Sequence, residues 1–562
     1  MMKRFLFCLS LAVIIYILTF LINVPDYDLW ARLAVGSIFF QTGHVLKHDI
    51  FSYLPTKNLW IDHEWGSSVV FYFLTKYLGE WGLFALKAVI LLTIFILIIK
   101  IIKLQTGKNA GIFYLTFIGF SLLPGFANLI RCQVFTYMFF TLWLYVLEKI
   151  RRGENHGYEP QIKREKSFAA SSWVSYPTLC PDKVGAQLSI PAVLRYRNWS
   201  FTNKLIWIFP ATMLLWANMH GGFLAGIGLV IIYAFGELFN RKNFLRYFGI
   251  LALIIPVTFI NPYGFDLWNY IIEAAIMPRP HIWEWTSISL KGPVHIFAGF
   301  KIHILTGFMF IVLLAIIVSI KLLLQKERPD WTKIILFIIL LYLGIKHQRH
   351  TVFFMLAASG LFYYQFVDLF NPLQRFIRDI LTEKVYKVWN ITKYSFGYIV
   401  LGGIFVYTIP HLSDNIIVDP FVYPVGSLEF IKQNNISGNL ATSFGWGSYA
   451  FWKLYPQCKV LIDGRYEEVY SNDVYAKAMQ FSEHEKNWQE VLKEYHSDIL
   501  VLPKCVYSRS DALSLTDWEI VYLDEVSALL LPKNKIKHFY IYPNYRNPLY
   551  WKENLSKEIP LD

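Results

Sequence analysis

Charged residues are scarce in this sequence. Only 17% of its 562 residues are Asp, Glu, Lys or Arg, whereas 55% are hydrophobic and 18% are aromatic. A water-soluble chain carries about a quarter charged residues, so the shortage excludes an ordinary soluble globular protein. Cysteine is scarce as well, because five residues spread over this length supply no disulfide framework.

Long apolar runs take the place of the missing charges. Runs such as 83–102 and 304–324 are long enough to cross a bilayer as helices. The first run follows Lys3 and Arg4 but lacks the small-residue cleavage site of a secretory signal, so we expect it to be retained. The pattern predicts a polytopic α-helical membrane protein with about eleven transmembrane helices. We place them at 5–24, 82–102, 110–128, 132–148, 205–219, 222–240, 246–260, 303–323, 333–346, 351–369 and 394–411.

Positive charge is unevenly distributed along the chain. From residue 412 onward, 15 Lys and Arg stand against 20 Asp and Glu, whereas the preceding part has 38 against 20. The positive excess lies in short loops between apolar runs, which is typical of cytoplasmic loops and does not indicate a nucleic-acid partner. We therefore expect the cell (plasma or inner) membrane, with a cytoplasmic N-terminus and a cytoplasmic insertion at 149–204. The long first loop at 25–81 should lie outside, with an interfacial amphipathic helix at 63–79.

The pattern changes at about residue 412, where we expect the transmembrane domain (1–411) to give way to an extracytoplasmic α/β domain (412–562). Asp463 and Arg465 follow one of its expected strands, at the end where α/β domains often place binding groups. A structural cap and ion pair is the alternative. The expected strands are 439–443, 459–463, 498–503, 519–525 and 527–532, and the expected helices are 425–434 and 487–497.

Unusual polar residues gather near the outer ends of the expected helices, whereas the middles of the spans carry almost no ionisable residue. Asp26 and Asp28 directly follow the first span. Each residue alone could be an interfacial anchor, but the gathering indicates a cavity at the outer leaflet. A transporter would instead show charged or broken-helix features near the midplane. The other candidates on this side are His63, Glu64, Arg131, His220, Glu284 and Arg349.

Chemistry in such a cavity would use a donor that arrives through lipid, and a sugar on a polyprenyl phosphate is the natural case. The reaction needs a carboxylate that takes a proton from the acceptor and cations that stabilise the leaving phosphate. Asp26 or Asp28 could supply the base, and Arg131 or Arg349 the phosphate contact. Two other interpretations of the aspartates stay open: a helix-end solvation device and a metal clamp.

The motifs of the chain resemble those of a known superfamily. In layout and motifs the sequence is similar to integral-membrane glycosyltransferases of the GT-C superfamily, in particular to a poorly characterised prokaryotic group. It is more distantly similar to protein mannosyltransferases and oligosaccharyltransferase catalytic subunits. The likeness covers nearly the whole chain except 149–204. It rests on Asp-Tyr-Asp-Leu-Trp at 26–30, Asp-Ile-Phe-Ser-Tyr at 49–53, His-Glu-Trp at 63–65, Trp-Ala-Asn-Met-His-Gly-Gly-Phe at 216–223, Asn-Pro-Tyr-Gly at 261–264, Gly-Ser-Tyr at 447–449 and Ile-Asp-Gly-Arg at 462–465.

The resemblance implies a lipid-phosphate sugar donor and an inverting displacement, with Asp26 or Asp28 as base or metal ligand. Whether this pair holds a divalent cation such as Mg or Mn stays open, because members of the superfamily differ. The acceptor would be an extracytoplasmic glycan, lipid or protein.

Residues 443–452 are faintly similar to the element with which oligosaccharyltransferases grip their acceptor peptide. Gly445 stands where that element has aspartate, which argues against recognition of a peptide sequon. Trp446, Tyr449, Asp463 and Arg465 are the candidates for the acceptor side. The alternatives from other classes are a lipid-linked glycan transporter or flippase, and a non-catalytic envelope assembly protein.

Overall fold

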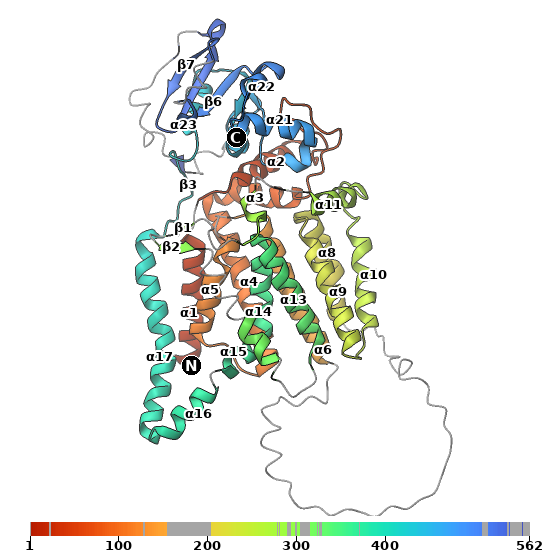
Figure 1. Ribbon diagram of the computed structural model, residues 1–562, viewed down its shortest axis with the longest axis vertical. Coiled ribbons are helices and arrows are strands. Elements are labelled where there is room, and N and C mark those ends of the chain that lie inside the picture. Colours follow the sequence, from red (N-terminus) through yellow and green to blue (C-terminus); the bar gives the residue numbers. More distant parts are fainter. Residues whose placement is uncertain are drawn as a thin grey trace, which may run out of the picture.

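A helical bundle carries a smaller sheet domain at one end, and the N-terminus lies toward the other end (Figure 1). This computed structural model describes residues 2–21, 24–126, 130–153, 204–277, 279, 282–288, 294–297, 300–303, 315–322, 324, 329–369, 371–507, 515–536, 539 and 553–554.

Each expected span that falls in the described part contains a bundle helix, whereas most of 303–323 lies outside it. The long helices are α1 (Met2–Phe20), α4 (Glu80–Thr106), α5 (Ile112–Leu122), α6 (Gln133–Gly153), α8 (Ile208–Met219), α9 (Phe223–Phe239), α10 (Leu245–Val257), α13 (Trp331–Lys346), α14 (Thr351–Leu361) and α17 (Glu383–Thr408). Shorter pieces are η1 (Leu123–Phe126), η3 (Lys204–Trp207), η5 (Gln348–His350), α15 (Tyr363–Leu369), α16 (Asn371–Ile380) and η6 (Ile409–His411).

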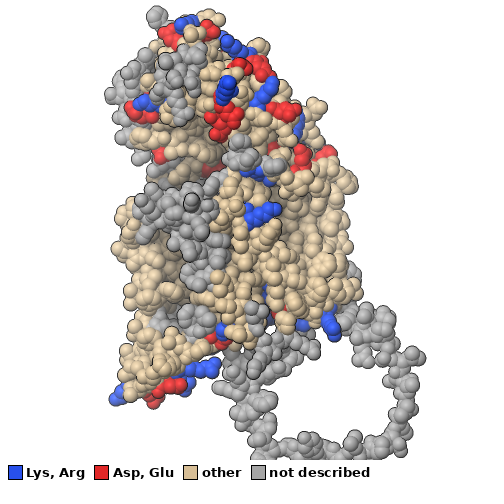
Figure 2. Space-filling view, in the orientation of Figure 1, with Lys and Arg blue, Asp and Glu red and all other residues tan. Residues whose placement is uncertain are grey.

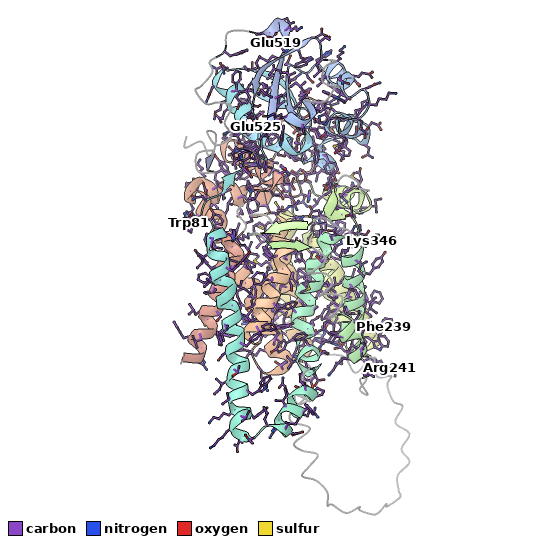
Figure 3. All side chains as sticks on the ribbon, turned by 60° about the vertical axis from the view of Figure 1, so that its left-hand side comes forward. Trp81, Phe239, Arg241, Lys346, Glu519 and Glu525 are labelled. Atoms are coloured by element: carbon purple, nitrogen blue, oxygen red, sulfur yellow. The ribbon has the colours of Figure 1, made fainter. Side chains whose placement is uncertain are left out.

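The bundle has the surface of a membrane protein over much of its length. Within the described residues, α4 is long and apolar enough to cross a bilayer, and Gln348–Leu361 with Tyr363–Ile380 forms a second candidate that bends by 66°. Charged side chains gather on the sheet domain and at the far end of the bundle, with a largely uncharged band between them (Figure 2). Trp81 and Lys346 lie near one edge of this band, and Phe239 and Arg241 near the other (Figure 3). The number of eleven spans stays a prediction.

Three helices lie between the bundle and the sheet domain: α2 (Tyr27–Thr42), α3 (Trp65–Leu78) and α11 (Asp266–Ile276) (Figure 1). The α3 helix confirms the expected helix at 63–79, and Gly79, with φ +59°, separates it from α4. The Cβ position of Gly36 in α2 would overlap the Ser68 carbonyl of α3. The two helices therefore pack backbone against backbone, and α2 has a fixed position above the bundle.

The sheet domain has five strands in the order β5-β4-β6-β8-β7. Strand β4 is parallel to β5 and β6, whereas β8 is antiparallel to β6 and β7. All five expected strands and both expected helices are present. The elements are β4 (Gly438–Thr442), β5 (Cys458–Val460), β6 (Ile499–Pro503), β7 (Trp518–Leu523), β8 (Ser527–Pro532), α18 (Val425–Gln433) and α22 (Gln489–Glu494).

Several elements differ from the sequence-based expectations. Helix α19 (Phe444–Leu454) contains two glycines that lower its helix propensity, yet the Cβ position of Gly447 would overlap the Ile462 carbonyl, so packing demands glycine there. The segment 371–393, which lies between the expected spans 351–369 and 394–411, is largely helical, in α16 and the start of α17. Further short elements are α20 (Tyr466–Val469), α21 (Asn472–Ser482), α23 (Lys504–Tyr507), η4 (Trp283–Trp285), η8 (Lys533–Lys535), and the pairs β1 (Val294–Phe297) with β2 (Phe300–His303) and β3 (Ile417–Val418) with β9 (Glu553–Asn554).

The first long loop, at 25–81, contributes to the sheet domain. Ser52 pairs in parallel with Val460 at the edge strand β5. The Val460 amide donates to the Phe51 carbonyl at 2.8 Å, and the Tyr53 amide donates to the Val460 carbonyl at 3.1 Å. Backbone hydrogen bonds therefore connect two segments that are far apart in the sequence, and the loop and the sheet domain form one unit.

Ionisable residues do not gather at the outer ends alone, so that inference was wrong. At the end of the bundle away from the sheet domain, Arg151 of α6 lies 2.7 Å from Glu237 and 2.5 Å from Asp330. Its guanidinium also lies 3.5 Å from Glu148. From sequence, Arg151 looked like one more positive charge of a cytoplasmic loop, because the pattern does not reveal which helices meet there.

Candidate active site

Asp26 and Asp28 flank the start of α2 and have different surroundings. Asp26 is the N-cap residue, and its carboxylate accepts a hydrogen bond from the Asp28 amide at 3.0 Å. The helix-end interpretation therefore accounts for Asp26. The side chain of Asp28 is 44% exposed, against 11% for Asp26, and its carboxylate faces a cleft. Helix capping does not account for Asp28.

Arg131 contacts three of the other residues expected in the site. Its Nε lies 3.3 Å from Asp26 Oδ2, its Nη2 lies 3.1 Å from Asp28 Oδ2, and its Nη1 lies 2.8 Å from Glu284 Oε1. The three carboxylates come from the start of α2 and from η4, and Arg131 lies two residues before α6. Three segments that are far apart in the sequence thus meet at one guanidinium.

The environment makes Asp28 a weaker acid than usual. The surrounding protein raises its pKa, the charge of Asp26 raises it further, and Arg131 offsets only part of this, so the pKa reaches about 7. Water still reaches the carboxylate, because the group lies in an open cleft rather than in a closed core. A carboxylate with a pKa near neutrality is suited to general base catalysis.

A second group of candidates surrounds Glu64. His220 Nε2 lies 3.4 Å from Glu64 Oε1, and His63 Nε2 lies 3.7 Å from the same atom. The Nδ1 atom of His220 accepts the Gly222 amide at 2.8 Å, so the proton of its neutral ring is on Nε2 and points to Glu64. Burial lowers the pKa of His220 to about 3. Burial opposes ionisation of Glu64, but Arg32 and His63 outweigh it and lower the pKa of Glu64 to about 2.

Sequence reasoning missed Arg32 and Glu468. Arg32 lies 2.5 Å from Asp62 Oδ1 and 3.6 Å from Glu64, and it is almost fully buried. Arg32 lies four residues after Asp28 in α2, and residues with this spacing share a helix face. This spacing could have indicated that Arg32 lies near the site. Glu468 of the sheet domain lies 2.9 Å from His63 Nδ1, a contact that no sequence pattern reveals.

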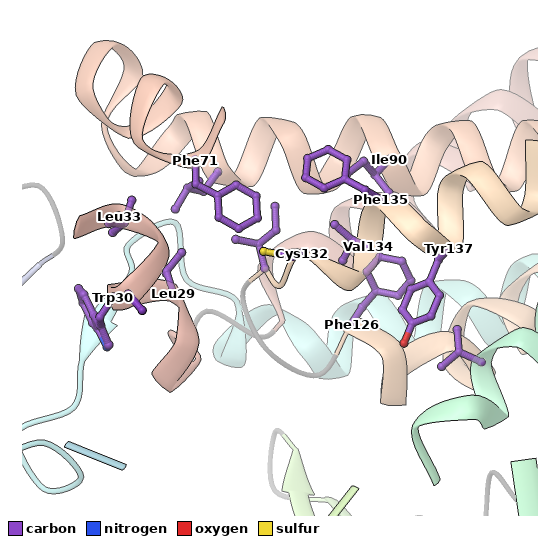
Figure 4. Packing of buried hydrophobic residues seen from close by; sticks show 14 of the residues in the cluster. Leu29, Trp30, Leu33, Phe71, Ile90, Phe126, Cys132, Val134, Phe135 and Tyr137 are labelled. Carbon is purple, nitrogen blue, oxygen red and sulfur yellow. The ribbon is translucent and has the colours of Figure 1, made fainter. Parts of the chain in front are cut away.

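Both groups open into one cleft of about 270 Å³, including its mouth. Three of the lining residues, Leu29, Phe71 and Cys132, lie close together in the packing shown in Figure 4. Asp28 and Glu64, from the two groups, thus face the same space. The lining residues are Asp28, Leu29, Arg32, Glu64, Phe71, Ile130, Arg131, Cys132 and Gln133.

Arg349 stands beside this site. Its guanidinium carbon lies 4.6 Å from the centre of the Trp285 ring, which fixes the side chain by a cation–π contact. Its charge helps Arg131 lower the pKa of Glu284 against the effect of burial. Among the described residues, Arg349 has no carboxylate within 4 Å, so its charge is available to an anionic ligand.

The four candidates for the acceptor side lie inside the sheet domain rather than at the cleft. Trp446 donates to the Val422 carbonyl at 2.9 Å, and the Tyr449 ring packs 4.9 Å from Trp30. Asp463 and Arg465 are 0% and 2% exposed. Their burial favours the structural interpretation that sequence left open.

Arg465 connects the sheet domain to the first loop. It lies 2.7 Å from both Asp463 and Asp49. Its guanidinium carbon lies 4.7 Å from the centre of the Trp60 ring. A buried cation with two carboxylates and an aromatic face is held tightly, so this pair fixes the position of the intervening Gly464.

Gly464 brings the sheet domain against the candidate base. A Cβ atom at this position would lie 2.6 Å from Asp28 Oδ1. Only glycine lets the backbone of the Ile-Asp-Gly-Arg motif approach so closely. Within this motif, Gly464 therefore lies against the site, whereas Asp463 and Arg465 hold Gly464 in place.

The arrangement does not fit a divalent cation between Asp26 and Asp28, because the Arg131 guanidinium already contacts both. In the described part of the chain, His63, Glu64 and Glu468 could each offer one ligand atom, with these atoms within 4.8 Å of one another. However, Arg32 lies 3.6 Å from Glu64 and 3.9 Å from Glu468. Positive charge is thus already present at both groups.

No family model matches the sequence, and no curated protein matches it either. Solved structures nevertheless share its fold. The apo oligosaccharyltransferase of Archaeoglobus fulgidus aligns with a TM-score of 0.58 at 9% identity, over 89% of this chain and 69% of that one. AglB from the same organism, in complex with an inhibitory peptide and a dolichol-phosphate, aligns with a TM-score of 0.54 at 10% identity, over 97% and 76%.

ArnT from Cupriavidus metallidurans, bound to undecaprenyl phosphate, aligns less well, with a TM-score of 0.49 at 12% identity over 94% of this chain and 97% of that one. This value is too low to carry an argument. The likeness to the two oligosaccharyltransferase structures shows that the chain has a GT-C-like fold. The resemblance seen in the motifs is thereby confirmed at the level of the fold.

Proposed function

We propose that this protein is a membrane glycosyltransferase that moves a sugar from a polyprenyl-phosphate donor to an extracytoplasmic acceptor. One observation carries the proposal: a carboxylate with a pKa of about 7, Asp28, lies in a cleft beside Arg131, where the helical bundle meets the sheet domain. The GT-C-like fold supports the same class of reaction by analogy, and the site rather than the fold carries the proposal.

Asp28 would act as the general base. It takes the proton of an acceptor hydroxyl or amide while the acceptor atom forms a bond to the anomeric carbon of the sugar. The bond between that carbon and the phosphate oxygen breaks, and its electron pair leaves with the polyprenyl phosphate. A single displacement of this kind inverts the anomeric configuration. Asp26 keeps the helix start in place and does not touch the reacting atoms.

Arg349 would bind the phosphate of the donor. Its guanidinium is fixed on Trp285, beside Glu284, and can match the oxygens of a phosphate group. The negative charge that develops on the leaving phosphate would then be stabilised by a group that needs no rearrangement during the reaction. Glu64 and Arg32, which also line the cleft, would contact the sugar or the acceptor.

Sugar transfer from labelled polyprenyl-phosphate lipids in membranes tests the proposal. We expect wild-type protein to transfer label, Asp28→Asn to lose transfer, and Asp26→Asn to retain most of it because Asn is also a good N-cap residue. Transfer that is unchanged in Asp28→Asn contradicts the assignment of the base. Lipid movement without transfer, insensitive to Asp28→Asn, would instead support a flippase.

A further inference from the structure

The contacts of Arg131 divide its guanidinium among three acids. Three different nitrogens of its guanidinium face three carboxylates: Nε faces Asp26 at 3.3 Å, Nη2 faces Asp28 at 3.1 Å, and Nη1 faces Glu284 at 2.8 Å. Each acid therefore faces its own N–H group, and the planar guanidinium lies between the three carboxylates. A simple surface ion pair would use one acid.

Three carboxylates this close need a cation between them, because like charges in a half-buried place repel strongly. A divalent metal ion could fill that role with oxygen ligands, at about 2.0–2.2 Å for Mg²⁺. The space is instead taken by the guanidinium, which is always charged. The electrostatic need that a metal would meet is thus met by the chain itself.

We propose that Arg131 is a built-in replacement for a divalent cation in this site. Resting on the proposed function, the inference is that sugar transfer needs no divalent ion at the Asp26–Asp28 pair. Arg131 acts as a positioning residue: it contacts Asp26, lowers the pKa of Glu284 and holds the Asp28 carboxylate toward the cleft. Its own nitrogens are occupied by the three acids, so Arg349 is left for the phosphate.

A cation replacement differs from a merely structural ion pair in what is expected when the guanidinium is removed. Removing the guanidinium while keeping the length of the side chain leaves three carboxylates around an open space that water can reach, since Asp28 is 44% exposed. Such a set of oxygen ligands is what Mn²⁺ and Mg²⁺ prefer. Arg131→Met should therefore create a metal site that the wild-type protein lacks.

The test uses the purified full chain in detergent and Mn²⁺ as the probe, with free Mn²⁺ measured by electron paramagnetic resonance. We expect Arg131→Met to bind Mn²⁺ at least about tenfold more tightly than wild type, and the double variant Arg131→Met/Asp28→Asn to lose this gain. Arg131→Lys, which keeps a positive charge, should bind no better than wild type. Thermal unfolding of each variant shows whether it is folded.

Two results would overturn the inference. One is wild-type protein that binds Mn²⁺ as tightly as Arg131→Met and loses that binding in Asp28→Asn. The other is wild-type transfer that a chelator abolishes and Mn²⁺ restores, a measurement that does not depend on whether Arg131→Met folds. If wild type transfers no sugar while the Mn²⁺ pattern holds, the proposed function fails and the cation replacement stands.

Discussion

The two ends of α6 carry the same set of charges in opposite surroundings. Arg131 lies two residues before the helix and Arg151 lies in its last turn, and each guanidinium meets three carboxylates. Around Arg151 the acids are almost fully enclosed except Asp330, and Tyr233 donates to Glu148 at 2.8 Å. Around Arg131 the cluster opens to a cleft. The same charges therefore hold helices together at one end and leave a carboxylate able to react at the other.

The largest expected effect is on the rate of sugar transfer, which should depend on the open cluster around Arg131 and not on the closed cluster around Arg151. Asp28→Asn should reduce sugar transfer by about 10²- to 10⁴-fold, the usual contribution of a general base, with little loss of stability because Asp28 is half exposed. The matched variant Glu237→Gln in the closed cluster should lower stability and leave the transfer rate of the folded protein unchanged. Transfer assays and thermal unfolding of both variants check this pair. Equal loss of transfer in both would remove the distinction between the two ends.

The closed cluster around Arg151 should contribute more to the free energy of unfolding than the open cluster around Arg131. Arg151→Met leaves buried carboxylates without their partner, which costs about 3–5 kcal/mol in the free energy of unfolding. Arg131→Met should cost less, because water reaches the acids that it leaves behind. Chemical denaturation of both variants in the same detergent gives the comparison. A larger loss for Arg131→Met would mean that the site is the more rigid of the two ends.

A substitution at Gly464 in the sheet domain should affect the open cluster around Arg131 and leave the closed cluster around Arg151 unchanged. Gly464→Ala places a methyl group 2.6 Å from Asp28 Oδ1 and so displaces the carboxylate. Displacements of about 1 Å in a catalytic group cost up to about 100-fold in rate, so we expect transfer to fall by about 10- to 100-fold. Gly445→Ala is the control, because its Cβ would lie at an ordinary 3.6 Å from the Tyr27 ring. Equal rates for the two variants contradict the close contact with Asp28.

The smallest expected effect is a pH dependence. The base must be unprotonated, so transfer should rise with pH and level off above the Asp28 pKa of about 7. Because that pKa is raised above the ordinary 3.8, the folded state binds this proton more tightly than the unfolded state does. The contribution of Asp28 to stability is thus greatest at low pH and falls as pH rises through about 7. A rate that levels off near pH 4 would contradict the raised pKa.

Much of the fold could be predicted from the sequence, because apolar runs and strand patterns are local signals. The strands at 499–503 and 527–532 are short apolar runs bounded by turns, and both form. The charge pattern predicted that Asp26, Asp28, Arg131 and Glu284 lie at one end of the helical bundle, where the structure brings them together. Their meeting at one guanidinium could not be predicted, since the pattern does not specify how helices are rotated or which of them are neighbours.

The contacts that sequence reasoning missed are all long-range. Glu468 meets His63 across the boundary between the first loop and the sheet domain. Trp446 and Tyr449 were expected to face an acceptor, but both pack in the interior. The sequence alone does not distinguish an aromatic residue of the core from an aromatic residue of a binding site. The enclosed cluster at Arg151 was read as loop charge for the same reason. Side chains at helix ends can point into a neighbouring helix or into water, and composition does not distinguish the two.

The pairing of the first loop with the sheet domain bears on how the protein is made. Ser52 hydrogen-bonds to the Leu461 carbonyl, 409 residues further along the chain. When the ribosome has produced the bundle, Asp28 and Arg131 are already present, but Gly464, which packs against Asp28, is not. During this stage Asp28 lacks its neighbour from the sheet domain. We therefore expect the cleft to take its final form only when the sheet domain has folded against the first loop.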